Sequence, residues 1–309
     1  MKKKILAVLL VGILAVASAG GWYVDQLLDR VDYETDETVP AAEPDTLWQD
    51  DVLNILLLGT DERSEEYDDF ARSYCIMILS LDKGSKDIRL VSLERGIGVP
   101  VEGREDDWLT HVFTYGGAEA SVKTVRECFE IPIDRYVRVN FSAFEQIIDA
   151  LGGVDIELTQ KEANHLNNPA YAGTYGTGLK TVKAGMNHLD GKTALAYSRI
   201  RKIDMDAVRT QRQRKVITAL INAYRSKSMG EMVTLADDIL STGFVRTNMS
   251  ADEILSYVRS LFPMLSTATI NSQQIPASGT YQNMYVGNVT DCKVADLEAN
   301  RQILKNILQ

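Results

Sequence analysis

Cysteine and histidine are scarce in this sequence, and their scarcity excludes several kinds of site. The three cysteines are an odd number in a chain of 309 residues, so a disulfide framework is not expected. The three histidines, His111, His165 and His188, lack the close spacing of a zinc site. The sequence also contains no complete Gly-x-x-x-x-Gly-Lys-Ser/Thr loop and no Gly-x-Ser-x-Gly turn. An ordinary nucleoside triphosphate site and the simplest serine hydrolase are therefore not indicated.

Positive charge is the minority sign in this chain. The 33 lysines and arginines are outnumbered by 43 acidic residues, which gives a net charge of −10. A sequence-independent nucleic-acid binder needs clustered cations to neutralise phosphate, so nucleic acid is not an expected partner. Between Val31 and Asp51 there are many acids and no base, and Pro40 and Pro44 break any helix. We interpret residues 25–51 as an acidic linker.

The N-terminus carries a long apolar run. Lys2–Lys4 precede an uncharged apolar stretch, Ile5–Val24, which as a helix is long enough to cross a hydrocarbon core of about 30 Å. The lysines predict a cytoplasmic tail over residues 1–4 and an extracytoplasmic domain after a single membrane span. A cleaved signal peptide is the alternative, because Ala17–Ala19 resembles a cleavage site, whereas Trp22 and Tyr23 suit the outer interface of an anchor. Both alternatives export the folded domain, which we place at the cell membrane.

Strand-like and helix-like runs alternate from Val52 onward. We predict strands over residues 53–58, 75–81, 88–93, 135–140 and 154–158, and helices over 118–128, 141–151, 191–198 and 206–226, with a loop over 165–179. This alternation favours an α/β layered fold with a mostly buried sheet. Residues 222–309 are expected to be mainly helical, including 251–261 and 295–308, with one edge strand over 268–275.

Arginines gather between residues 199 and 214. If Arg199 and Arg201 lie on an extended segment, their spacing puts both guanidinium groups on one face. Arg209 and Gln213 share a face of the following helix, and Arg212 lies next to it. Cations held this close repel one another, and a doubly charged pyrophosphate is their natural occupant because arginine offers planar bidentate donors.

Two further arginines follow predicted strands. Arg63 lies just beyond the strand 53–58, and Arg95 lies just beyond the strand 88–93. Ligands of open α/β sheets bind outside the carboxyl ends of strands. This placement favours a ligand site over the alternative, which is a solvated basic helix face with Asp204 and Asp206 as ion-pair partners.

Several ordered blocks resemble the LytR–CpsA–Psr family of bacterial cell-envelope proteins. The resemblance covers about residues 52–221 and rests on Asn54–Asp61, Arg72–Ser73, Ser92–Arg95, Asp149–Val154, His188–Arg201 and Arg209–Gln213. It implies a three-layer αβα domain over residues 52–309, with a mixed central sheet, one preceding transmembrane helix and a hydrophobic cavity for a polyprenyl chain. It implies an enzyme, a phosphotransferase that moves a glycopolymer such as teichoic acid from a polyprenyl pyrophosphate carrier to peptidoglycan as a phosphodiester. The implied partners are the lipid-linked glycopolymer, peptidoglycan and the cytoplasmic membrane.

The resemblance also assigns roles to single residues. Pyrophosphate binding falls to Arg63, Arg95, Arg199, Arg201 and Arg209, with Gln213 in support, and Arg212 joins them from its place on the same helix. The arginines would neutralise charge that develops on the leaving phosphate. Mg²⁺ commonly accompanies this chemistry by bridging phosphate oxygens.

Two positions depart from the family pattern. The family usually has Arg-Ser-Asp where this chain has Tyr74 as the third residue, and Pro-Arg-Asp where it has Glu94, Arg95 and Gly96. Tyrosine ionises near pH 10 and glycine has no side chain, so neither replaces an aspartate that holds magnesium or activates a hydroxyl. Glu94 and Asp61 remain as candidate catalytic carboxylates and metal ligands, beside Arg95. The alternatives to an active transferase are a domain that binds lipid-linked pyrophosphate without transfer, and an envelope regulatory or scaffold protein.

Overall fold

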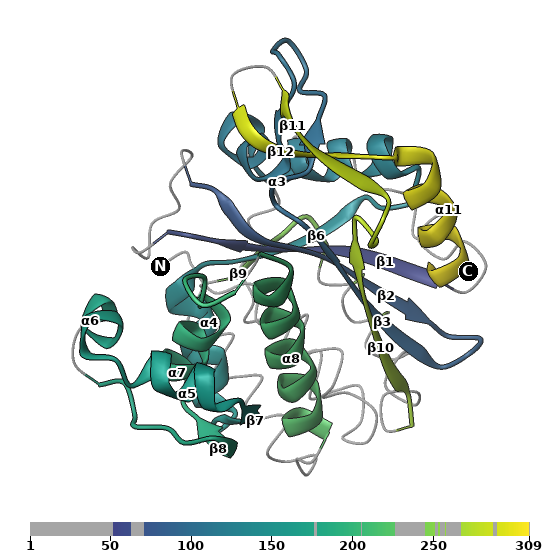
Figure 1. Ribbon diagram of the computed structural model, residues 1–309. Coiled ribbons are helices and arrows are strands. Elements are labelled where there is room, and N and C mark those ends of the chain that lie inside the picture. The colour runs from purple at the N-terminus through teal and green to yellow at the C-terminus, as the bar shows by residue number, and fades with distance from the viewer. Residues whose placement is uncertain are drawn as a thin grey trace, which may run out of the picture.

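The computed structural model describes most of the domain predicted after Val52 (Figure 1). The described residues are 52–62, 71–175, 178–204, 206–225, 245–250, 253, 257, 267–286 and 289–308. The predictions for residues 1–4, 5–24 and 25–51, and for Arg63, lie outside them. Within these ranges no helix has the length and apolar character needed to cross a membrane.

A mixed sheet of six strands forms the middle of the fold, as the family resemblance implies. Its strand order is β10-β3-β2-β1-β6-β9. The strands are β1 (Val52–Thr60), β2 (Ser73–Asp82), β3 (Asp87–Leu93), β6 (Arg135–Val139), β9 (Val245–Thr247) and β10 (Thr269–Ile275). β1 pairs antiparallel with β2 and parallel with β6, and β10 runs parallel to β3.

The apolar run of β1 explains why both faces of the sheet are covered. Successive side chains of a strand point to opposite faces. Ile55 and Leu57 accordingly pack in one core cluster, whereas Leu56 and Leu58 pack in another. A strand that is apolar on both faces needs a layer on each side.

Helices supply both layers (Figure 1). On one face lie α4 (Phe141–Ala150), α5 (Gln160–Leu166), α7 (Gly191–Ser198) and α8 (Asp206–Arg225), with the short hairpin β7 (Val154–Leu158) and β8 (Gly185–Leu189). The small α6 (Pro169–Ala172) and the 3₁₀ turn η2 (Gly173–Tyr175) follow α5 and precede β8. On the other face lie α3 (Leu109–Phe129), α11 (Leu297–Leu308) and the hairpin β11 (Tyr281–Val286) and β12 (Val289–Ala295), with the small strands β4 (Gly98–Val99) and β5 (Asp107–Trp108).

Polar caps start the helices that border the site. The Asn140 side chain accepts a hydrogen bond from the Ala143 amide at the start of α4, and Asp190 does the same for Thr193 at the start of α7. The two helices approach closely at Gly191, where a Cβ atom would lie 2.1 Å from the Glu145 carbonyl oxygen. Only glycine fits there, and this contact fixes the start of α7 against α4.

The predicted strands and helices are confirmed within the described ranges up to residue 225, and the helix predicted over 295–308 is confirmed as α11. The prediction of a mainly helical C-terminal part is wrong for residues 267–308. Residues 267–308 form three strands and one helix rather than a mainly helical region. β10 has a polar sequence that becomes a strand because it pairs with every residue of β3. Its place at the edge of the sheet confirms the predicted edge strand. The predicted helix over 251–261 lies mostly outside the described residues, and the predicted loop over 165–179 contains α6 and η2.

Candidate functional site

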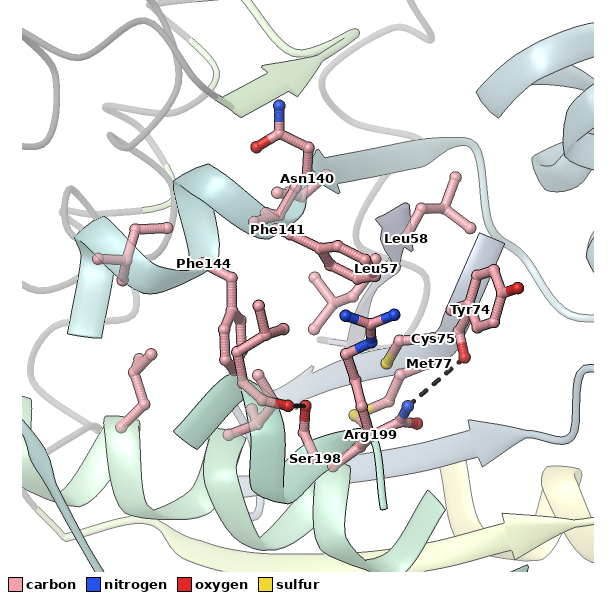
Figure 2. A pocket seen from close by; sticks show the side chains of 18 residues that line it. Leu57, Leu58, Tyr74, Cys75, Met77, Asn140, Phe141, Phe144, Ser198 and Arg199 are labelled. Atoms are coloured by element: carbon pink, nitrogen blue, oxygen red, sulfur yellow. Dashed lines mark hydrogen bonds between the residues drawn. The ribbon is translucent and has the colours of Figure 1, made fainter. Parts of the chain in front are cut away.

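An apolar cavity opens between the sheet and helices α4, α7 and α8 (Figure 2). Strands β1, β2 and β6 and the three helices contribute its wall, which includes Leu57, Met77, Val137, Phe144, Leu195 and Ile217. The cavity encloses about 860 Å³, part of it open to solvent. Burial raises the pKa of the Cys75 thiol in this wall to about 11, so the sulfur is a neutral packing group. Such a wall suits a hydrocarbon chain.

A second cavity adjoins the first and is basic. The two share Tyr74, Arg199 and Gln213 in their walls. The second cavity, of about 1040 Å³ including open solvent, adds Arg201, Lys202 and Arg209, together with polar and aromatic residues. None of its described wall residues is acidic. The pair of cavities therefore matches a ligand with an apolar tail and an anionic head.

Arg199 and Arg201 reach the basic cavity from the end of α7. The condition of an extended segment is not met: Arg199 is the C-cap of α7, and its amide donates to the Leu195 and Ala196 carbonyls at 3.2 Å. Arg201 follows in the loop to α8. The two arginines line one cavity because the chain turns between α7 and α8, and not because of strand alternation.

Aromatic rings hold the Arg199 side chain over the mouth of the apolar cavity. Its guanidinium carbon lies 4.1 Å from the centre of the Phe141 ring and 5.5 Å from that of Tyr175. Figure 2 shows the guanidinium group beside Phe141 and Leu57, above the apolar wall. A cation at this distance from a ring is attracted by the ring's negative face. Arg199 therefore marks the boundary between the two cavities.

Arg95 lies close to Tyr74, which lines both cavities. The guanidinium carbon of Arg95 lies 5.4 Å from the centre of the Tyr74 ring, and that of Arg201 lies 5.7 Å from it. The Tyr74 carbonyl accepts a hydrogen bond of 3.5 Å from Gln213 Nε2, which ties β2 to α8 (Figure 2). Arg209 and Gln213, both buried, line the basic cavity from one face of α8, as their spacing predicts.

Arg212 does not join the cluster, and here the prediction from the sequence is wrong. Its Nε donates to Glu162 at 2.7 Å, its Nη1 donates to the Ile200 carbonyl at 3.3 Å, and its Nη2 pairs with Asp204. Burial by itself would raise the pKa of Glu162, but hydrogen bonds from Thr159 and Arg212 hold it below its usual value. Arg212 is a buried structural cation that joins α8 to α5.

The candidate carboxylates lie outside both cavities. Glu94 is 1% exposed; it forms an ion pair with Lys293 and accepts a 2.5 Å hydrogen bond from Gln274, so its side chain is directed toward β10 and β12. Asp61 is partly exposed just beyond β1, where its Oδ1 accepts a 2.8 Å hydrogen bond from the Arg72 amide. Among the described residues no cation pairs with Asp61.

The described residues do not fit a magnesium site. Mg²⁺ is held by carboxylates together with water and phosphate oxygens. The described part of the chain contains no group of three His, Cys, Asp or Glu side chains placed to hold a metal ion. The cavity where phosphate would lie has a tyrosine in its wall, Tyr74, and no carboxylate among its described residues.

The aromatic side of the basic cavity was not predicted from the sequence. His165, Tyr171 and Tyr175 line it from the segment expected to be a plain loop. The Tyr171 hydroxyl donates to the Ala196 carbonyl at 2.7 Å and lies 3.2 Å from the Tyr175 hydroxyl. The His165 ring lies 4.1 Å from that of Tyr171, with the two planes tilted by 42°. Burial, with Arg212 and Lys202 adding to it, lowers the His165 pKa. The four-residue spacing of the tyrosines was the available signal.

Known proteins with similar sequences and structures point to one family. The LytR_cpsA_psr family model matches residues 26–305. The polyisoprenyl-teichoic acid–peptidoglycan teichoic acid transferase TagT of Bacillus subtilis is 34% identical over 220 residues, which cover 70% of this chain and 65% of that protein. TagU of Bacillus mycoides, a transferase of the same name, is 31% identical over 90% of both chains. A solved structure of YwtF (TagT) with bound octaprenyl pyrophosphate lipid is 25% identical, with a TM-score of 0.61, and covers 89% of this chain and 95% of that one.

Proposed function

This chain belongs to the LytR_cpsA_psr family, and on that premise we propose that it transfers a glycopolymer of the teichoic acid class from a polyprenyl pyrophosphate carrier to peptidoglycan. The observation that carries the proposal is the junction of an apolar and a basic cavity at Tyr74, Arg199 and Gln213. A polyprenyl chain suits the first cavity and a pyrophosphate the second. The activities named for TagT and TagU, and the octaprenyl pyrophosphate bound in the YwtF structure, support the same assignment.

The proposed step is a phosphoryl transfer. A hydroxyl oxygen of peptidoglycan attacks the phosphorus that carries the polymer, and the bond from that phosphorus to the bridging oxygen breaks. The polymer is then attached as a phosphodiester, polyprenyl phosphate leaves, and the hydroxyl proton passes to a base. Arg199, Arg201 and Arg209 neutralise the charge that grows on the leaving phosphate, and the fixed geometry of the two cavities positions the carrier.

We assign the base to Asp61 rather than Glu94. A general base must be able to accept a proton, and the carboxylate of Glu94 is already held by Lys293 and Gln274. Asp61 follows β1 two residues after Gly59, which lines the apolar cavity. Its partly exposed side chain is open to an acceptor that approaches from solvent.

A second candidate function is binding of the lipid-linked precursor without transfer. The side chain of Glu94 is neutralised by Lys293, and Tyr74 stands where the family has an acid. Both observations weaken the catalytic machinery while leaving the two cavities complete.

The sequence supports a location for this activity. We propose that residues 5–24 anchor the chain in the cytoplasmic membrane and that the domain after Val52 lies outside it, near the carrier lipid and peptidoglycan. The support is the apolar run preceded by three lysines.

A transfer assay tests the proposed function. The full chain in a mild detergent is mixed with a polyprenyl pyrophosphate that carries a labelled short glycan, and with peptidoglycan oligomers as acceptor. We expect label on the peptidoglycan and an equal amount of polyprenyl phosphate. Asp61→Asn should remove transfer and retain binding of the lipid. Binding without transfer in the unmodified chain would favour the second candidate, and no binding would reject both.

A further inference from the structure

Tyr74 occupies a position between the two cavities that the proposed reaction does not explain. It lines both cavities, and the guanidinium groups of Arg95 and Arg201 lie near the centre of its ring, at 5.4 and 5.7 Å. The two arginines come from distant parts of the sequence, one after β3 and one after α7. One aromatic ring therefore orients two cations that like charge would otherwise drive apart.

The described wall of the basic cavity carries charge of one sign only. Its described wall contains four cationic side chains, Arg199, Arg201, Lys202 and Arg209, and no acidic one. A doubly charged pyrophosphate is neutralised by fewer cations than these. A divalent cation that approached this wall would meet repulsion and find no carboxylate ligand among the described residues.

We infer that Tyr74 is a positioning residue that presents Arg95 and Arg201 to the carrier pyrophosphate, and that this chain binds the pyrophosphate without a divalent cation. The inference rests on the proposed function, because it concerns the headgroup of the same lipid. The ring attracts both guanidinium groups through its face, so it does not compete with phosphate oxygens for their N–H groups. An aspartate at this position would instead form ion pairs with them or hold a metal ion.

The test measures binding of octaprenyl pyrophosphate, octaprenyl phosphate and octaprenol to the full chain in detergent, by calorimetry, with Mg²⁺ and with EDTA. We expect the affinity for the pyrophosphate to be the same in both conditions. Binding that appears only with Mg²⁺ would overturn the inference and leave the proposed function standing. No binding in either condition would overturn the proposed function itself.

Variants of Tyr74 separate positioning from folding. Tyr74→Phe keeps the ring and should retain the affinity. Tyr74→Ala should weaken pyrophosphate binding by about 3- to 30-fold, the range expected for the loss of one or two cation–π contacts. It should weaken octaprenol binding by less, because the ring is only one part of the apolar wall. Tyr74→Asp should make binding dependent on Mg²⁺. Equal losses for the pyrophosphate and the alcohol in Tyr74→Ala would indicate a structural role and overturn the inference.

Tyr115 offers a matched control. It is a tyrosine with an arginine, Arg104, 4.2 Å from its ring centre, and it lies on α3 in the opposite layer. Tyr115→Ala removes an aromatic–arginine contact of the same kind away from both cavities. It should change neither the affinity nor the response to EDTA, so a loss equal to that of Tyr74→Ala would contradict the inference.

Discussion

The guanidinium carbon of Arg199 lies 4.1 Å from the centre of the Phe141 ring, so a cation from the end of α7 rests on the first residue of α4. The contact stands where the apolar cavity meets the basic one. A charge placed on an aromatic ring keeps its N–H donors directed outward while its carbon atoms cover apolar surface. Arg199 therefore joins the apolar cavity to the basic one.

Removing the Phe141 ring should weaken headgroup binding. Phe141→Leu keeps an apolar side chain in the cavity wall but removes the partner of Arg199. We expect the affinity for octaprenyl pyrophosphate to fall by about 2- to 30-fold, and the affinity for octaprenol to change little. Calorimetry on the full chain measures both. Equal affinities of the variant and the unmodified chain for the pyrophosphate would show that the ring does not orient Arg199.

Filling the apolar cavity should weaken binding of the lipid tail. Ile217 lines the cavity from α8, and Ile217→Trp places a larger apolar side chain there. We expect octaprenyl pyrophosphate to lose affinity, whereas inorganic pyrophosphate, which needs only the basic cavity, should bind as before. The exposed residue Glu127 on α3, changed to Trp, serves as a control that should affect neither ligand. Loss of both ligands in Ile217→Trp would mean that the headgroup and the tail do not occupy separate cavities.

Breaking the ion pair between Arg212 and Glu162 should lower the stability of the fold rather than the transfer activity. The two side chains are 3% and 6% exposed, so Arg212→Gln leaves a buried carboxylate without its cation. We expect a loss of about 3 kcal/mol in the free energy of unfolding near neutral pH, measured by urea denaturation. Exchange of the exposed Arg126 for Gln is the control and should change stability by less than about 0.5 kcal/mol.

The loss of stability in Arg212→Gln should depend on pH, because it involves the charge of Glu162. The native pKa of Glu162 lies below its usual value, so the stability that its charge contributes is present above about pH 4.5 and disappears as the pH falls through the lowered pKa. Arg212→Gln removes this contribution, and the difference between the variant and the unmodified chain should therefore shrink as the pH falls below about 4.5. A difference that stays constant from neutral to acid pH would contradict the assignment.

Ligand binding should depend on the protonation of His165. Burial first, and then Arg212 and Lys202, lower the pKa of this imidazole, so it is neutral at neutral pH. A pyrophosphate in the same cavity raises that pKa, and binding then takes up a proton. We expect affinity to rise as the pH falls below about 6.5, and His165→Gln to remove that part of the pH dependence. His188→Gln, at an exposed position on β8, should retain it.

The local sequence predicted most of the elements of this fold and the anionic character of the proposed ligand. The apolar run of β1 required a sheet covered on both faces, and the capping residues Asn140 and Asp190 set the starts of α4 and α7. The arginines around residues 199–213 predicted an anion site. These features follow from the sequence because periodicity, capping and charge act between neighbours along the chain.

Tertiary structure alone decided which of these side chains share a cavity. Arg209 and Arg212 lie three residues apart on α8, yet Arg209 lines the basic cavity whereas Arg212 is held by Glu162 from α5. Glu94 stands beside Arg95, but its carboxylate turns to Lys293 on β12, a strand that pairs with β11 far along the chain. Each outcome depends on partners that are distant in sequence, and the pattern along one segment does not contain them.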